Sequence, residues 1–267
     1  MITGPETNPY INFRSKHPGL LCLSEVPIAV IRLRNSFEQR RVDINYAQSW
    51  LDQVVKIGID NDLTDVFQEQ DRDIKVTKKI GSGFFTSVFG FETSMGSWVL
   101  KIGARKSPVP GWLDPSCEEY ANWYAQCLKT MRSIYDDSLP NLIPKPQYVM
   151  YPNKENEVTS IVIQPLIPSV EPLSKIHTKE PEVKRAILNE LETFYAKSEL
   201  LRKDYGIFPD LGSNNNLVLA KNNNEYHLTL IDNNPIDLHA ISPVMNAYNL
   251  IRYHGRLRGN IAKLKRT

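Results

Sequence analysis

The sequence predicts an α+β fold in which an antiparallel sheet and most of the helices occupy separate parts of the chain. Short β-rich runs broken by glycine follow one another over residues 73–104, a pattern typical of a twisted antiparallel sheet. Residues 181–203 carry an apolar stripe at helical spacing. Two short strands then flank the asparagine turn at 222–224, and a basic, helix-like tail follows. The expected order is five strands with an inserted helix, then a helix, a hairpin and a helix.

The chain before the predicted sheet contains one clear helix. Residues 1–25 are rich in Pro, Gly and Asn and are expected to form an arm, and residues 27–34 are a strand candidate. Residues 45–59 place five apolar side chains on one helical face: Ala47, Trp50, Leu51, Val54 and Ile57. This face is expected to cover a neighbouring surface, which the sequence does not identify.

The inserted helix is expected from Pro115 to Tyr135, with proline near its start, where a missing N–H costs least. Residues 146–151 and 159–167 then supply two further strands. The predicted organisation has three segments: an N-terminal extension with one helix (1–72), a segment that holds the five-stranded sheet (73–166) and a mainly helical segment (167–267).

Composition excludes several classes of protein. A net charge of +2 and a 23% share of charged residues give no electrostatic basis for binding nucleic acid or membrane. We see no signal peptide and no run of about 18 apolar residues that would span a membrane. Three cysteines form neither a disulfide framework nor a CxxC site. A cytoplasmic location is expected, and delivery into another cell stays open.

Two motifs lie in the predicted sheet. The first is IGSGFFTSVF, which contains Gly81, Ser82 and Gly83, followed by Val88. Glycine lets a backbone close over phosphates where a Cβ would collide. The alternative is an ordinary turn, which paired glycines also mark. WVLKIG places Lys101 in an otherwise apolar strand. A lysine rarely faces a core without a partner, so Lys101 indicates either a functional site or a solvent-facing edge strand.

The strongest motif is FPDLGSNNNLVL followed by LTLIDNNP. It contains Asp210, Asn215 five residues later, and Asp232 at the end of the second apolar strand. A carboxylate and an amide oxygen suit magnesium, which prefers hard oxygen ligands. The alternative is a pair of Asp/Asn-rich turns beside a hairpin.

The order of these motifs over residues 76–238 resembles the protein-kinase-like superfamily. The resemblance implies that the chain binds ATP and Mg²⁺ between two lobes. Gly81, Ser82, Gly83 and Val88 then correspond to the loop over the phosphates and the cap on the base. Lys101 corresponds to the lysine that grips the phosphates, and Glu119 to the helix glutamate that braces it.

The same resemblance assigns the remaining site residues. Asp210 is expected to orient or deprotonate the acceptor hydroxyl, while Asn215 and Asp232 hold magnesium. IVIQPLIPS resembles the hinge, with Ile163 as gatekeeper, the carbonyl of Gln164 facing the adenine amine, and the Leu166 N–H as donor. An ordinary proline-terminated strand is the alternative for this segment.

The sequence departs from protein kinases at several positions. Phe208-Pro209 replaces the His-Arg before the catalytic aspartate, Gly212 replaces a lysine, and Asn233-Asn234 follows the metal aspartate. These features are closer to atypical or minimal members, similar to YrbL-like, RIO-like and aminoglycoside-phosphotransferase-like kinases. Since 35 residues follow Asp232 (267 − 232), the C-lobe is expected to be truncated.

The predicted function is therefore ATP-dependent transfer of the γ-phosphoryl group to a hydroxyl acceptor, with protein Ser/Thr favoured and a small molecule also open. The alternatives are a pseudokinase scaffold that binds nucleotide or a partner protein, and an unrelated protein whose motifs coincide by chance. The basic tail Arg252–Thr267 is either a solvated helix face or a patch for an acidic partner.

Overall fold

The computed structural model describes residues 28–31, 42–60, 63–82, 86–104, 117–152, 158–211, 216–222, 224–231, 235–237, 254–255, 257–262 and 264–265. The chain divides into two compact units. The first, called the sheet unit, comprises Tyr10–Gln126 and Lys145–Leu166. The second, called the α4 unit, comprises Met1–Pro9, Cys127–Pro144 and Ile167–Thr267.

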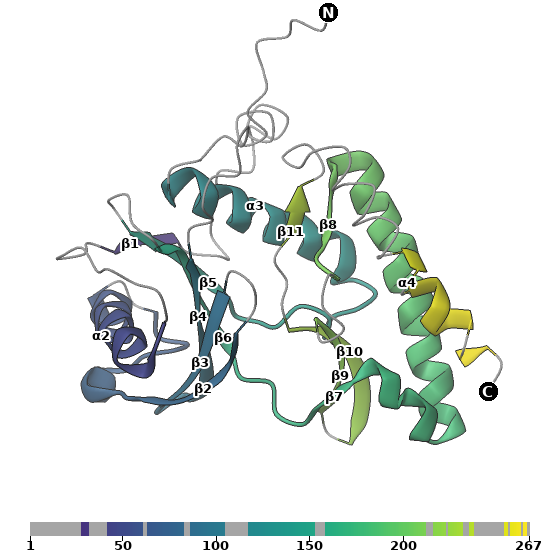
Figure 1. Ribbon diagram of the computed structural model, residues 1–267, viewed down its shortest axis with the longest axis horizontal. Coiled ribbons are helices and arrows are strands. Elements are labelled where there is room, and N and C mark those ends of the chain that lie inside the picture. Colours follow the sequence, from purple (N-terminus) through teal and green to yellow (C-terminus); the bar gives the residue numbers. More distant parts are fainter. Residues whose placement is uncertain are drawn as a thin grey trace, which may run out of the picture. The chain divides into compact units, whose positions relative to one another are not determined.

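The sheet unit contains a six-stranded sheet of order β1-β5-β6-β4-β3-β2 (Figure 1). In that order the strands are Ile28–Ile31, Tyr148–Pro152, Val158–Pro165, Gly96–Ala104, Thr86–Thr93 and Val76–Ser82. Every pair from β5 to β2 is antiparallel, which confirms the predicted five-stranded antiparallel sheet and the α+β class. The sequence did not predict that β1 would extend the sheet by pairing in parallel with β5.

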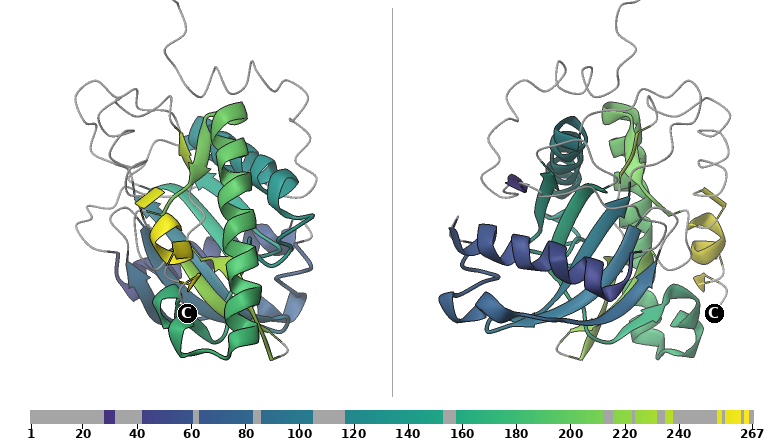
Figure 2. Two further views of the ribbon diagram at one scale, coloured as in Figure 1. Left: turned by 90° about the vertical axis from the view of Figure 1, so that its right-hand side faces the viewer. Right: turned by 60° about the vertical axis from the view of Figure 1, so that its left-hand side comes forward.

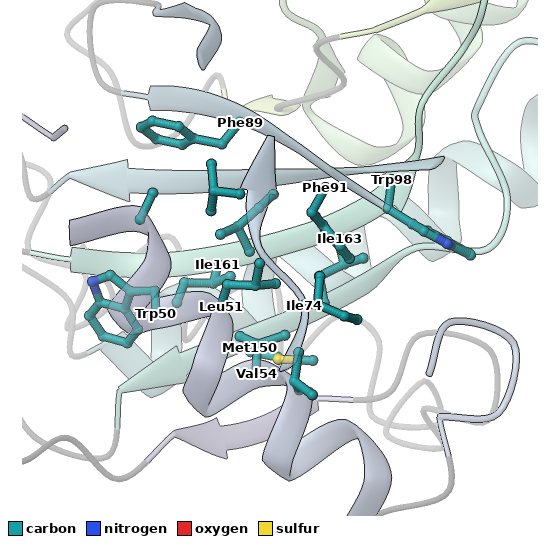
Figure 3. Packing of buried hydrophobic residues seen from close by; sticks show 14 of the residues in the cluster. Trp50, Leu51, Val54, Ile74, Phe89, Phe91, Trp98, Met150, Ile161 and Ile163 are labelled. Atoms are coloured by element: carbon teal, nitrogen blue, oxygen red, sulfur yellow. The ribbon is translucent and has the colours of Figure 1, made fainter. Parts of the chain in front are cut away.

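Helix α2 (Ile44–Asp60) covers one face of this sheet. The helix begins after Asp43, whose carboxylate accepts the Tyr46 N–H at 2.9 Å, as in an N-cap. Trp50, Leu51 and Val54 are buried and pack against apolar side chains of four strands, as Figure 3 shows. Those strand residues include Phe89, Phe91, Leu100, Ile102, Ile161, Ile163 and Met150.

The predicted apolar face of this helix is therefore confirmed, and the surface that it covers is the sheet. Ile57, which the sequence placed on the same stripe, is only partly buried. Residues 42–72 belong to the sheet unit because α2 and the sheet share one core. A short 3₁₀ helix, η2 (Glu69–Asp73), leads from α2 toward β2.

The α4 unit is built on helix α4 (Pro181–Tyr205). Proline opens this helix at its first turn, where no N–H is needed, and Gly206 ends it with a φ of 69°, a left-handed conformation that favours glycine. The second half of helix α3 (Cys117–Tyr135) belongs to this unit. There Tyr135 stacks on Phe194 with 5.5 Å between ring centroids.

Two small sheets complete the α4 unit. One has the order β10-β9-β7, and the other pairs β11 with β8. Their strands are β7 (Val170–Pro172), β8 (Ile207–Pro209), β9 (Leu217–Asn222), β10 (Glu225–Leu230) and β11 (Pro235–Asp237), and η3 (Leu173–Thr178) follows β7. The sequence predicted the β9–β10 hairpin and missed the three-residue strands, which are too short to show an alternating pattern.

Candidate functional site

Lys101 lies on β4, an inner strand between β3 and β6, and its side chain is 5% exposed. The register places it opposite Val88 on β3 and Val162 on β6. Since successive side chains alternate between the faces of a strand, Lys101 faces away from the core that α2 covers, to which Leu100 and Ile102 belong. The alternative of a solvent-facing lysine on an edge strand is therefore wrong.

The register of β6 corrects the predicted gatekeeper. Ile163 pairs with Leu100 and belongs to the α2 core, so it lies on the face opposite Lys101. Gln164 pairs with Val99 and shares the face of Lys101. The Gln164 side chain is buried, and its Oε1 accepts a 2.9 Å hydrogen bond from Nε2 of Gln147.

The predicted hinge donor also needs correction. The backbone N–H of Leu166 donates to the carbonyl of Ser97 at 2.9 Å, which extends the β4–β6 ladder by one residue. That N–H is therefore committed to the sheet and is not available to an adenine ring. The N–H of Ile167, the next residue, has no hydrogen-bond partner within the described part of the chain.

The strand that leads into the glycine loop is irregular. β2 contains register shifts between Val76 and Lys78 and between Lys79 and Gly81, and such bulges bend a strand. A Cβ built at Gly81 would meet no heavy atom within 4 Å, so the space beside it is open. Ser82 ends β2, its side chain is outside the described set, and Gly83 lies outside the described residues.

An apolar side chain that the sequence analysis did not single out lies beside this loop. Ile80 is 42% exposed, and its Cδ1 would lie 3.3 Å from a Cβ added at Gly90. Gly90 pairs with Val99, so Ile80 projects over the same face as Lys101. The sequence signal was present, because Ile80 directly precedes the first glycine of the motif.

Asp210 directly follows β8 in the α4 unit and is partly buried. Its backbone carbonyl accepts a 2.8 Å hydrogen bond from Nδ2 of Asn216. The carbonyl of Asn216 in turn accepts the N–H of Ile231 at 2.9 Å, the residue before Asp232. Asn216 therefore connects the Asp210 segment to the end of β10, while the predicted ligands Asn215 and Asp232 lie outside the described residues.

Sequence reasoning chose Asn215 by its interval from Asp210 and passed over Asn216. The Asn216 side chain is 7% exposed, and its amide oxygen has no partner among the described residues. With its nitrogen held by Asp210, that oxygen can serve as a ligand. The available signal was the position of Asn216, immediately before β9.

The remaining predicted residue, Glu119, lies in the first turn of α3, but its side chain is outside the described set. Among described residues, no three His, Cys, Asp or Glu side chains gather where they could hold a metal ion. None of the described helices has the length and apolar character needed to cross a bilayer.

The basic tail packs on α4 (Figure 2). Arg258 donates from Nε and Nη2 to the hydroxyl of Tyr195 at 3.1 and 3.0 Å, and Lys265 lies 2.6 Å from Glu192. His254 approaches both Tyr195 and Glu199. The basic side chains of Arg258 and Lys265 are therefore engaged within the α4 unit. The other four basic residues of the tail lie outside the described residues: Arg252, Arg256, Lys263 and Arg266.

No protein-family model matches the sequence, and no curated protein matches it. Among solved structures, the BubR1 kinase domain is similar, with a TM-score of 0.45 and 13% sequence identity. The alignment covers 89% of this chain and 64% of the BubR1 chain, so this chain spans less than two thirds of that chain.

Proposed function

We propose that this chain is an ATP-dependent phosphotransferase that moves the γ-phosphoryl group of Mg-ATP to a hydroxyl acceptor. The observation that carries the proposal is the buried Lys101 on β4, the third strand counted from the glycine-loop strand β2. Protein kinases carry their phosphate-gripping lysine on the corresponding strand. Burial beside Val88 and Val162 lowers the local dielectric, which strengthens the attraction of a lysine for an anion.

The same face of the sheet offers an apolar surface for a purine. Ile80, Val88 and Val99 flank Lys101 there, and the amide of Gln164 borders it. Because Gln164 replaces Ile163 at the gatekeeper position, the hinge contacts move by one residue. The carbonyl of Pro165 and the N–H of Ile167 are then the proposed adenine contacts, in place of Gln164 and Leu166.

The acceptor side of the proposal rests on the α4 unit. Asp210 would orient or deprotonate the acceptor hydroxyl, and Asp232 and the amide oxygen of Asn216 would hold magnesium. Two oxygen donors leave room for phosphate and water in the ion's coordination shell. When bound, the ion neutralises charge that develops on the phosphoryl oxygens. The hydrogen bond from Asn216 to the Asp210 carbonyl would keep the base and the metal ligand in fixed relation.

A thermal-shift titration with Mg-ATP tests the nucleotide site. A ligand that binds only the folded state at 100-fold excess over Kd adds about 2.7 kcal/mol of stability, so the wild type should melt at a higher temperature. Lys101→Ala should abolish this shift, while Lys56→Ala, an exposed lysine on α2, should keep it. An unchanged wild-type melting temperature in millimolar nucleotide would refute the proposal.

Turnover separates a phosphotransferase from a nucleotide-binding scaffold. Asp210→Asn should keep the Mg-ATP shift and lower phosphoryl transfer by about 10²-fold or more, because a general base acts on the transition state. A wild type that binds Mg-ATP but shows no ATP turnover would instead identify a pseudokinase. A variant that loses affinity and keeps its turnover would contradict the role of Asp210.

A further inference from the structure

Strand β2 lies at one end of the sheet order and has a single strand neighbour, β3, in the described part of the chain. A side chain of α2 bonds to its backbone. Nε2 of Gln48 donates to the Ile74 carbonyl at 2.9 Å, and Oε1 of Gln48 accepts the Val76 N–H at 2.8 Å. One amide group thus makes the two hydrogen bonds that a residue of a neighbouring strand would make.

The Gln48 amide is itself held in place. Its Nε2 also donates to Oδ1 of Asp52, one helical turn further along α2, at 2.6 Å. Both amide protons and the amide oxygen of Gln48 are therefore used, which fixes the orientation of the group. A second link joins β2 to the segment just before α2, since Nζ of Lys79 donates to the carbonyl of Val42 at 3.2 Å.

The β2–β3 ladder is irregular. Its two register shifts interrupt regular pairing on either side of Lys78 and Lys79, and each bulge leaves a residue unpaired. On its way to Gly81, β2 is therefore contacted by α2 as well as by β3. Gln48 supplies those contacts at the first residue of the strand, Val76.

We infer that Gln48 is a positioning residue through which α2 sets the path of β2 into the glycine loop. The segment before the sheet then controls where Ile80 and Gly81 lie beside a bound nucleotide, and loss of the Gln48 contact weakens nucleotide binding without removing any group that touches the nucleotide. The link between Gln48 and β2 stands on the hydrogen bonds alone, whereas its effect on nucleotide rests on the proposed function.

The test compares Gln48→Ala with Gln53→Ala in the full chain. Gln53 is a matched control, since it lies on α2, is partly buried, and donates to the Ser49 carbonyl within the same helix. Amide hydrogen exchange of residues 76–82 is measured without nucleotide, and the Kd for Mg-ATP is measured by titration. Gln48→Ala should speed exchange at Val76 and weaken Mg-ATP binding by about fivefold to tenfold each. Gln53→Ala should change neither by more than about twofold.

Each outcome decides one part of the inference. Unchanged exchange at Val76 in Gln48→Ala would overturn the positioning role, and faster exchange with unchanged Kd would overturn the coupling to the nucleotide. A wild type that does not bind Mg-ATP would refute the proposed function, while the exchange data would still decide whether Gln48 holds β2. If Gln48→Ala fails to fold, Gln48→Met keeps the length of the side chain and removes the amide donor to Ile74 and the amide acceptor for Val76, and the same two shifts are expected in the same direction.

Discussion

Leu51 is the position where the shared core of α2 and the sheet can be tested most directly. It is fully buried among strand side chains and aromatic residues of α2. Leu51→Ala removes three carbon atoms, which forfeits about 2.4 kcal/mol of transfer free energy at about 0.8 kcal/mol per methylene. A residual cavity adds to that loss, so we expect the free energy of unfolding of the sheet unit to fall by about 3 kcal/mol.

Urea denaturation followed by tryptophan fluorescence measures this loss, because Trp50 and Trp98 are both buried in the same core. Lys56→Ala, on the exposed side of α2, is the control and should change stability by less than about 0.5 kcal/mol. Ile57→Ala should cost clearly less than Leu51→Ala, because Ile57 is only partly buried. A loss below about 1 kcal/mol for Leu51→Ala would refute the conclusion that α2 and the sheet share one core.

Two further predictions concern an acid and an amide. Burial alone would raise the pKa of Asp71. Its carboxylate, however, accepts hydrogen bonds from the N–H groups of Ser94 and Gln68 and from the Ser94 hydroxyl. Together these bonds outweigh burial and hold the pKa below its ordinary value of 3.8. Asp71 therefore stabilises the fold above about pH 4, and this contribution is lost as the pH falls through the lower, folded pKa. Asp71→Asn should lower the free energy of unfolding by about 2 kcal/mol at pH 7 and by less in acid. The control Asp73→Asn, at an exposed position, should change it little. An equal loss for Asp71→Asn at pH 7 and pH 2 would contradict this account. Stabilisation by ATP is measured as a function of Mg²⁺ concentration. Asn216→Ala should raise the concentration of Mg²⁺ needed for half of the maximal effect by about tenfold or more, and Asn215→Ala should raise it less. The reverse order would restore Asn215 as the ligand.

Several features were predictable because local physics decides them. Apolar residues at helical spacing identified α2 and α4, since the period of 3.6 places them on one face. A lysine within an apolar strand indicated that Lys101 is buried for a reason, because an unpartnered ammonium group is costly in a core. Asp210 attracted attention because an aspartate followed by a run of asparagines combines turn geometry with oxygen ligands.

The gatekeeper illustrates what the sequence left undetermined. Ile161, Val162 and Ile163 are all apolar and all buried, and a strand whose side chains are buried on both faces shows no alternation in its sequence. A shift of one residue moves every side chain to the opposite face. Only pairing with β4 places Gln164 on the face of Lys101 and commits the Leu166 N–H to Ser97.

The asparagine run poses the same problem in another form. Asn214, Asn215 and Asn216 are chemically identical neighbours, so an interval counted from Asp210 cannot distinguish them when the loop length is free to vary by one residue. The hydrogen bonds to the Asp210 carbonyl and from the Ile231 N–H fix the position of Asn216, which is why we propose Asn216 as the ligand. The sequence by itself determined which elements form and which residue types carry the chemistry, because periodicity and burial cost are local. Tertiary structure decided which neighbouring residue faces the site, because strand register and loop closure depend on contacts between segments far apart in the chain.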